Sequence, residues 1–357
     1  MVKVITIADY YNCHEALPVI DVRSPGEFQR GRIPGAVNIA LFTNDERAAV
    51  GTTYVQTSQE EAIKLGYKFV TPKLGYFIEA SREVAKNGPV VVHCWRGGMR
   101  SQAFADHLSS NGFKEVYIIK GGYKAFRNYV LKYFEQPFQL RVIGGYTGSG
   151  KTEILKVLQT RGEQVIDLEG IAHHKGSAFG AIGEKNQPTS EHFENCLYAA
   201  FHQLNINEPI WIEDESMNIG NVNLPLELYR QIREQVVCFI DIPKKERIQN
   251  LIKDYAKFGD DVLSKAINRI AKRLGGQHVK AALSFLDEEN YFEVANIALQ
   301  YYDKAYLKGI SNRDAEKVLK ISLQKCRCFS FNYPDFLFSC EWSRGSFRFL
   351  QNAWPWR

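Results

Sequence analysis

The segment from Gly145 to Thr152 constrains the fold of this chain more than any other. It fits the pattern G-x-x-x-x-G-K-[ST], follows a strand-like run at 140–143 and opens an amphipathic helical pattern at 153–158. The amides of such a loop cradle phosphate oxygens, the lysine neutralises them, and the hydroxyl of Thr152 reaches a magnesium ion. The sequence therefore predicts a strand–loop–helix unit that binds phosphate through Gly145, Gly148, Ser149, Gly150, Lys151 and Thr152.

A second loop signature, His-Cys-Trp-Arg-Gly-Gly-Met-Arg-Ser, occupies residues 93–101 between an apolar run and a helical pattern that begins near Ser101. Glycines let backbone N–H groups turn inward, the following helix contributes its positive end, and Arg100 adds a cation. All three lower the pKa of a cysteine, whose thiolate is the nucleophile. A structural core cysteine needs neither glycines nor arginine. We therefore predict that Cys94 and Arg100 are catalytic and that the loop binds an anion through Arg96, Gly97, Gly98 and Ser101.

Length and composition are those expected of a cytoplasmic protein. The 357 residues suggest two domains. No stretch approaches the roughly 20 apolar residues of a membrane span, and the start lacks the apolar core of a signal peptide. The seven cysteines are odd in number and scattered, which favours a reducing compartment over a disulfide framework. The net charge of +5 is compatible with an RNA partner but is too small to indicate one.

Strand and helix patterns alternate along the chain, which predicts an α/β fold with parallel sheets covered on both faces. We expect an N-terminal domain at 1–135, a second domain at 136–325 that carries the phosphate loop, and an atypical tail at 326–357. The tail holds three of the cysteines without the pairing of zinc ligands. A charged helical layer or lid is expected from 244 to about 318. The expected strands are 19–22, 90–93 and 116–119 in the first domain, where 33–39 is expected to be a turn that leads into another strand. In the second domain they are 140–143, 164–166, 210–212 and 236–240.

Four carboxylates follow strand patterns of the second domain and are candidate contacts for a magnesium ion or a bound phosphate-containing ligand. Glu213 and Asp214 end an apolar strand, where an acid can orient the shell of a magnesium ion. The alternative for this pair is an exposed acidic loop. Asp167 and Glu169 follow the preceding strand, although Asp167 is equally suited to cap a helix.

Two further pairs have competing interpretations. His174 and Lys175 can contact phosphate or the RNA backbone, or they can form a solvated turn. Asp21 and Arg23 lie on and just after a strand, and ion pairing within the fold explains them adequately.

Residues 20–28 and 31–39, followed by the cysteine loop, resemble the rhodanese domain. The resemblance implies that Cys94 carries sulfur or a related chalcogen between a donor and an acceptor. The usual rhodanese loop has four residues between cysteine and arginine, whereas Cys94 and Arg100 enclose five. That spacing is also the H-C-x5-R signature of cysteine phosphatases, whose larger ring of amides suits a tetrahedral oxyanion. The loop alone leaves chalcogen transfer and phosphate-ester hydrolysis open.

The order of motifs along both domains resembles bacterial tRNA 2-selenouridine synthases. The resemblance covers roughly residues 15–320, and the tail past about Ser322 does not resemble the ending of that family. The segments that carry it are 44–51, 94–101, 121–125, 144–152, 167–170, 174–180, 213–216 with 219–220, 273–275 and 301–303.

This resemblance implies a tRNA-modifying transferase that replaces the sulfur of wobble 2-thiouridine with selenium from selenophosphate. The route it implies passes through an S-geranylated nucleotide made from geranyl diphosphate, whose diphosphate the loop at 145–152 would hold. It implies magnesium but no organic cofactor. The implied partners are tRNA, the two phosphorylated co-substrates and an enzyme that produces selenophosphate, with no membrane.

Two other classes of protein compete with this interpretation. A cysteine phosphatase fused to a kinase-like domain predicts a general acid near the thiolate, and no Asp or Glu lies in the Cys94 loop itself. A nucleotide-switched binding module predicts tight binding of ATP or GTP and no chemistry at Cys94.

Overall fold

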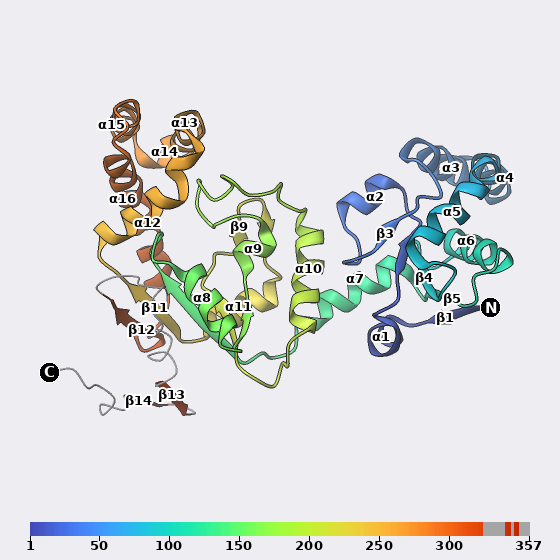
Figure 1. Cartoon of the computed structure of the whole chain (residues 1–357), viewed down its shortest axis with the longest axis horizontal. Helices are drawn as coiled ribbons and strands as arrows, with labels where there is room; N and C mark the ends of the chain where they lie inside the picture. Colours follow the sequence, from blue (N-terminus) through green and yellow to red (C-terminus); the bar gives the residue numbers. More distant parts are fainter. Residues whose placement is uncertain (324–339, 344–345, 350–357) are drawn as a thin grey trace. The chain divides into compact units, whose positions relative to one another are not determined.

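The structure is a computed structural model that describes residues 1–323 in full and the backbone of residues 340–343 and 346–349. The chain divides into two compact units (Figure 1). The first comprises Met1–Gln136 together with Thr189–Ala199, and the second comprises Pro137–Pro188 with Ala200–Arg357. The predicted tail at 326–357 lies outside the described residues apart from strands β13 (Cys340–Ser343) and β14 (Ser346–Phe349), which pair antiparallel.

The first unit is built on a five-stranded parallel sheet in the order β1-β5-β4-β2-β3. The residues of its three central strands are all buried, as expected of a parallel sheet with helices on both faces. The predicted α/β architecture is confirmed. Strand β1 was not predicted, and its edge position leaves half of its residues exposed. The strands are β1 (Val2–Ile5), β2 (Val19–Asp21), β3 (Val37–Asn38), β4 (Val90–His93) and β5 (Val116–Ile119).

Helices of the first unit pack on this sheet around a core that includes Val92, Phe104 and Leu108. A capping box at Thr43 starts one of them, because the Thr43 hydroxyl accepts from the N–H of Glu46 while the Glu46 carboxylate accepts from the N–H of Thr43. The helices are α1 (Ile7–Asp9), η1 (Tyr10–His14), α2 (Pro25–Arg30), α3 (Asn44–Gln56), α4 (Gln59–Val70), η2 (Thr71–Lys73), α5 (Leu74–Ala85), α6 (Met99–Ser110) and α7 (Gly122–Tyr133).

The second unit has its own five-stranded parallel sheet, in the order β12-β11-β6-β8-β7. Four of these strands match the sequence prediction. The fifth, β12, follows the helical layer and was missed, since an edge strand of five residues with an exposed lysine at Lys320 has little hydrophobic signal. The strands are β6 (Leu140–Gly145), β7 (Gln164–Ile166), β8 (Ile210–Glu213), β11 (Val237–Asp241) and β12 (Val318–Ser322), and a separate hairpin joins β9 (Asn218–Ile219) to β10 (Val222–Asn223).

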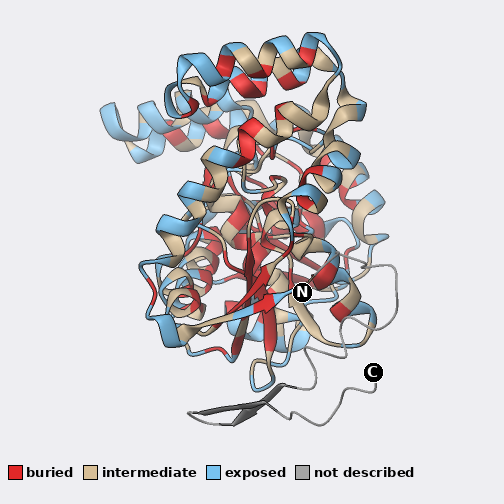
Figure 2. Ribbon diagram, turned by 90° about the vertical axis from the view of Figure 1, so that its left-hand side faces the viewer, coloured by how far each residue is buried: buried red, intermediate tan, exposed pale blue. Residues whose placement is uncertain are grey.

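The predicted helical layer is present and begins with α12, directly after β11. It encloses an apolar cluster of its own that includes Leu263, Ala282 and Ala298. Buried residues concentrate in the strands and on the inward sides of the helices (Figure 2). The helices of the second unit are α8 (Lys151–Thr160), α9 (Leu168–Ala172), α11 (Leu226–Glu234), α12 (Lys244–Tyr255), η3 (Ala256–Phe258), α13 (Asp260–Arg269), α14 (Ala271–Leu274), α15 (Gly276–Asp287), α16 (Tyr291–Ile310) and η4 (Ala315–Lys317), while α10 (Ser190–His202) begins in the first unit.

Within the part of the chain that the structure describes, no helix combines the length and the apolar character that a membrane crossing requires.

Candidate functional site

The thiol of Cys94 lies at the end of β4, where the central strand of the first unit meets the N-terminus of α6. The residue is 3% exposed, and its Sγ lies 3.3 Å from the Ser101 Oγ. Helix α6 begins at Met99, two residues earlier than predicted, directly after the glycine pair of the loop. The loop therefore joins a buried strand to a helix start, as the sequence indicated.

Opposing influences act on the ionisation of this thiol. Burial raises the pKa of Cys94. The hydrogen bond with Ser101, the positive charge of Arg100 and the backbone N–H groups of Ser101 and Arg96 lower it, and together they outweigh burial. The pKa thus lies below its ordinary value, in the predicted direction. The lowered pKa favours the thiolate, which is the form that attacks electrophiles, relative to an ordinary cysteine.

We expect the alkylation of Cys94 by iodoacetamide to reach half its maximal rate at a pH below the ordinary cysteine pKa of about 8.5. Ser101→Ala and Arg100→Ala are each expected to shift this midpoint upward, because each removes an interaction that lowers the pKa of Cys94. Peptide mass spectrometry of the alkylated protein at a series of pH values measures the midpoint. A midpoint unchanged in both variants would contradict the assigned cause.

Two glycines allow a second loop to close over the cysteine loop. Gly97 and Gly122 have φ values of +63° and +57°. A Cβ on Gly97 would lie 2.4 Å from the carbonyl oxygen of Ile119, and a Cβ on Gly122 would lie 2.3 Å from that of Cys94. The carbonyl of Cys94 accepts a hydrogen bond of 2.9 Å from the N–H of Tyr123. Side chains at these two positions would push the loops apart, so the turn at Gly122 fixes the position of Cys94.

Arg100 has a carboxylate partner that the sequence analysis missed. Its Nη1 lies 3.1 Å from Glu27 Oε2 on α2. Burial raises the pKa of Glu27, but Arg100 outweighs it, so the pKa of this carboxyl lies below its usual range. An ionised Glu27 is a partner for the guanidinium and not a proton donor at neutral pH. The only feature of the sequence that singled out Glu27 was its position three residues after Ser24, which is the spacing of a capping box.

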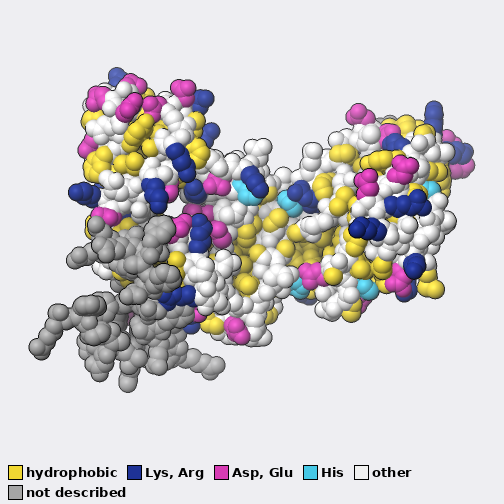
Figure 3. Space-filling view, in the orientation of Figure 1, with side chains coloured by type: hydrophobic (Ala, Val, Ile, Leu, Met, Phe, Trp, Pro, Cys, Tyr) yellow, Lys and Arg dark blue, Asp and Glu magenta, His cyan; other side chains and the backbone are white. Residues whose placement is uncertain are grey.

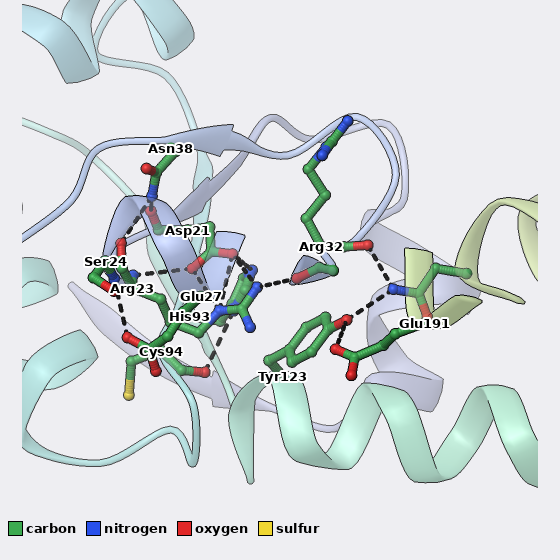
Figure 4. Close-up of polar contacts among 12 residues, drawn as sticks. Asp21, Arg23, Ser24, Glu27, Arg32, Asn38, His93, Cys94, Tyr123 and Glu191 are labelled. Carbon is green, nitrogen blue, oxygen red and sulfur yellow. Dashed lines mark hydrogen bonds and ion pairs between the residues drawn. The ribbon is translucent and has the colours of Figure 1, made fainter. Parts of the chain in front are cut away.

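The pair of Asp21 and Arg23 is buried next to His93, the residue before Cys94 (Figure 4). Arg23 Nη2 lies 2.6 Å from Asp21 Oδ2 and donates to the carbonyl of Gly31 at 2.6 Å. The guanidinium also lies 3.7 Å from the ring centre of Tyr123. His93 Nε2 is 3.7 Å from the same carboxylate, and burial lowers the pKa of His93. These contacts agree with the structural role expected for Asp21 and Arg23.

The phosphate loop of the second unit connects β6 to α8 and has three glycines with positive φ, namely Gly145, Gly148 and Gly150. Lys151 Nζ reaches back across the loop and donates to the carbonyl of Gly145 at 3.1 Å. The hydroxyl of Ser149 is buried and has no hydrogen-bond partner among the residues that the structure describes. A buried polar atom without a partner is costly, so this hydroxyl is suited to a phosphate oxygen.

Carboxylates surround the hydroxyl of Thr152 at the start of α8. Thr152 Oγ1 lies 3.1 Å from Glu169 Oε2 and 3.5 Å from Glu213 Oε1. Burial raises the pKa of Glu169 and Glu213, and the charge of Glu169 raises that of Glu213 further. Burial also raises the pKa of neighbouring Glu215 to about 8. The structure thus adds Glu215 to the predicted set.

This set of oxygens fits a magnesium ion. Magnesium is bound in proteins by one or two carboxylates together with substrate phosphates and water, and Glu213 is one such carboxylate beside the Thr152 hydroxyl. The charges of neighbouring carboxylates raise each other's pKa, and a nearby cation stabilises their ionised forms. Among the residues that the structure describes, no group of three or more histidine, cysteine, aspartate or glutamate side chains is arranged to hold a metal ion. Binding of a magnesium ion by Thr152 and Glu213 stays a prediction.

The other acidic candidates have structural partners. Asp167 caps α9, where its carboxylate accepts from the N–H of Gly170 at 2.7 Å. Asp214 is buried and lies 2.6 Å from Arg313 Nη2 and 3.0 Å from Arg233 Nη1. The structure therefore places Glu169 and Glu213 at the phosphate loop. Asp167 instead caps a helix, and Asp214 forms ion pairs with two arginines.

The basic candidates follow α9. His174 is buried, and burial lowers its pKa. Within the described part of the chain, its Nδ1 has no hydrogen-bond partner. Lys175 Nζ lies 3.3 Å from Glu184 Oε1 and 5.5 Å from the ring centre of Tyr255. His174 is therefore not a solvated side chain, whereas Lys175 is partly exposed. A contact of either side chain with phosphate or RNA stays a prediction.

Asp214→Ala is expected to lower the free energy of unfolding by about 3 kcal/mol, because it leaves the buried guanidinium of Arg313 without its carboxylate. Urea denaturation followed by tryptophan fluorescence measures the change. Glu316→Ala, at an exposed residue of the same unit, is the matched control and is expected to change stability by less than about 0.5 kcal/mol. Equal stability of the two variants would show that the pair contributes nothing.

A cysteine loop on one α/β unit and a phosphate-loop motif on another define a two-domain α/β protein with two candidate anion-binding sites. Residues 7–129 match the model of the rhodanese-like domain, and residues 138–332 match that of the tRNA 2-selenouridine synthase AAA domain. The chain belongs to the tRNA 2-selenouridine synthase family.

Relatives named tRNA 2-selenouridine synthase align with nearly the whole chain. The protein from Sulfurovum sp. (strain NBC37-1) is 34% identical over 88% of this chain and 95% of its own length. The protein from Shewanella frigidimarina is 35% identical over 84% of this chain and 90% of its own length. Among solved structures, the N-terminal domain of a putative ATP/GTP binding protein from Clostridium difficile 630 is 38% identical over 36% of this chain and 99% of its own, with a TM-score of 0.33.

Proposed function

We propose that this chain converts wobble 2-thiouridine of tRNA to 2-selenouridine in two steps, with geranyl diphosphate and selenophosphate as co-substrates. The observation that carries the proposal is the presence of two anion-binding loops with different chemistry in one chain. One has a buried cysteine of lowered pKa, and the other has a lysine, a hydroxyl and carboxylates. Family membership supports tRNA as the substrate. We place the activity in the cytoplasm, where tRNA is found.

The first step belongs to the phosphate loop. The sulfur of 2-thiouridine attacks C1 of geranyl diphosphate, the C1–O bond breaks, and diphosphate leaves with the electron pair while N3 loses its proton. Negative charge grows on the diphosphate, and Lys151 and the loop amides stabilise it. Thr152 and Glu213 would hold a magnesium ion, which would supply further positive charge there. No organic cofactor takes part.

The second step belongs to the cysteine loop. The Cys94 thiolate attacks phosphorus of selenophosphate, the P–Se bond breaks, and a hydrogen selenide ion leaves with the electron pair. Arg100 and the loop amides bind the phosphoryl group, for which the ring of five intervening residues is suited. Selenide then adds to C2 of the geranylated nucleotide and displaces geranylthiolate. The proton of hydrogen selenide passes to N3, which gives 2-selenouridine. Water then hydrolyses the phosphocysteine to phosphate and the Cys94 thiolate, and the proton released in this hydrolysis converts geranylthiolate to geranylthiol.

The proposal is tested with the purified chain and a tRNA that carries wobble 2-thiouridine. Geranyl diphosphate with magnesium is expected to give S-geranyl-2-thiouridine. Later addition of selenophosphate is expected to give 2-selenouridine and to release geranylthiol. Nucleoside mass spectrometry measures the two modified nucleosides. An enzyme that supplies selenophosphate can replace the chemical donor. Selenation at the same rate without geranyl diphosphate would contradict the two-step route.

The H-C-x5-R spacing also favours a phosphatase as a second candidate function. A phosphatase of this kind needs a protonated carboxyl to protonate the leaving alcohol. The carboxyl nearest to Arg100, that of Glu27, has a lowered pKa and is engaged by the guanidinium. Efficient hydrolysis of an aryl phosphate by the purified protein would favour this alternative.

A further inference from the structure

An apolar pocket opens beside the phosphate loop of the second unit. Its empty volume is about 510 Å³, part of which is open to solvent, and it lies between α12, α13 and α16. The side chains that line it are almost all apolar or aromatic, and Thr147 of the phosphate loop is among them. A ligand held by the loop can therefore extend into the pocket.

The pocket has little to offer the polar parts of a nucleotide. The hydroxyl of Tyr302 accepts from the N–H of Ala178 at 3.0 Å, and that of Tyr291 donates to Asp260 at 3.0 Å. The hydroxyl of Ser177 accepts from the N–H of Phe179 at 3.2 Å. These hydroxyls already have partners in the protein, so a base or ribose in the pocket would lose hydrogen bonds to water without full replacement.

Charge near the pocket is also compensated. Arg247, whose guanidinium donates to the carbonyl of Thr147 at 3.3 Å, forms an ion pair of 2.7 Å with Asp303. Burial raises the pKa of Tyr302 to about 12, so the ring stays neutral at physiological pH. An uncharged apolar chain is thus the chemistry that the wall accepts, while the anionic head of the same molecule lies in the phosphate loop.

The residues of helix α16 that line the pocket indicate how far it extends from the phosphate loop. Near its C-terminal end, the hydroxyl of Tyr306 accepts from the N–H of Gly145 in the phosphate loop. Residues that line the pocket recur toward the N-terminus of the helix, from Tyr302 through Ala298 and Ala295 to Tyr291. With a rise of about 1.5 Å per residue, Ala295 lies roughly 10 Å along the axis from Tyr302. This is similar to the extended length of a prenyl chain with two isoprene units.

We infer that this pocket binds the prenyl chain of an allylic diphosphate whose head group the phosphate loop holds, and that α16 determines the accepted chain length. Ala295 and Ala298 leave room for the chain beside the helix, and Tyr291 closes the far end. Hydrophobic side chains lie among charged ones on the surface of this helical layer (Figure 3), so a continuous apolar surface that would suit a membrane is not seen on that face. The inference rests on the proposed function and specifies how that site selects its donor.

Ala295→Phe tests the inference by shortening the pocket. Its kcat/KM for geranyl diphosphate is expected to fall about 100-fold, the scale of discrimination by size in an apolar pocket. Its kcat/KM for dimethylallyl diphosphate, which has one isoprene unit, is expected to stay at or above that of the unmodified chain. Ala305→Phe, at an exposed residue of the same helix, is the matched control and is expected to leave both values unchanged.

Tyr291→Ala tests the opposite change, and misfolding cannot produce its expected result. Opening the far end is expected to raise kcat/KM for farnesyl diphosphate relative to geranyl diphosphate by at least about 10-fold. If the unmodified chain transfers geranyl but both variants keep its chain-length preference, the pocket assignment is wrong and the proposed function stands. If the unmodified chain transfers no prenyl group from any of these donors, the proposed function fails and the pocket assignment fails with it.

Discussion

Cys94→Ser is expected to lower the rate of 2-selenouridine formation by more than about 1,000-fold, the scale of loss when an enzyme nucleophile is removed. The environment that lowers the pKa of Cys94 consists of one hydroxyl, one guanidinium and backbone amides. These groups can ionise a thiol but not an aliphatic hydroxyl, whose pKa is far higher. Nucleoside mass spectrometry after incubation with a geranylated tRNA and selenophosphate measures the loss.

The control is Cys13→Ser, which changes an exposed cysteine of the same unit and is expected to retain full activity. Geranylation by Cys94→Ser is expected to survive, because that step uses the phosphate loop of the other unit. A phosphoryl group on Cys94 after rapid acid quenching of the unmodified enzyme would support attack on phosphorus. Undiminished 2-selenouridine from Cys94→Ser would remove this residue from the mechanism.

Both loops were predictable from the sequence because each depends on local chemistry. A strand, a run of glycines at fixed spacing and a helix start determine where Cys94 and Lys151 lie, and none of these requires knowledge of a distant residue. The missing parts depend on long-range contacts. Glu27 approaches Arg100 across 73 positions of sequence, and β12 pairs with β11 only after the whole helical layer has been placed. The pocket beside Thr147 is assembled from three helices, so its apolar lining cannot be read from any one of them.

The two acids at the end of β8 show the limit of reasoning from residue type alone. Glu213 and Asp214 are adjacent, and the sequence offered both as candidates for the magnesium shell. Successive side chains on an extended strand point to opposite faces, so only one of them faces the phosphate loop. Glu213 reaches the Thr152 hydroxyl, whereas Asp214 pairs with the buried Arg313. The two acids therefore have different roles because Arg313, which follows α16 far along the chain, lies beside Asp214 and not beside Glu213.

Lys151→Ala is expected to lower the rate of geranyl transfer by about 100- to 1,000-fold. This is the usual loss when one preorganised group that stabilises charge in the transition state is removed. The ammonium group lies across the phosphate loop, 3.1 Å from the carbonyl oxygen of Gly145. There it is placed to neutralise the charge that grows on diphosphate as the C1–O bond breaks. Lys156→Ala, at an exposed position of the same helix, is the control and is expected to retain activity.

The same variant separates the two loops. Supplied with tRNA that already carries S-geranyl-2-thiouridine, Lys151→Ala is expected to form 2-selenouridine, because P–Se cleavage takes place at Cys94. For the unmodified enzyme, inorganic diphosphate is expected to compete with geranyl diphosphate, and ATP is expected not to accelerate the reaction. A requirement for ATP turnover would make the phosphate loop a nucleotide site. Complete loss of selenation of the geranylated tRNA would mean that Lys151 also serves the binding of tRNA or selenophosphate.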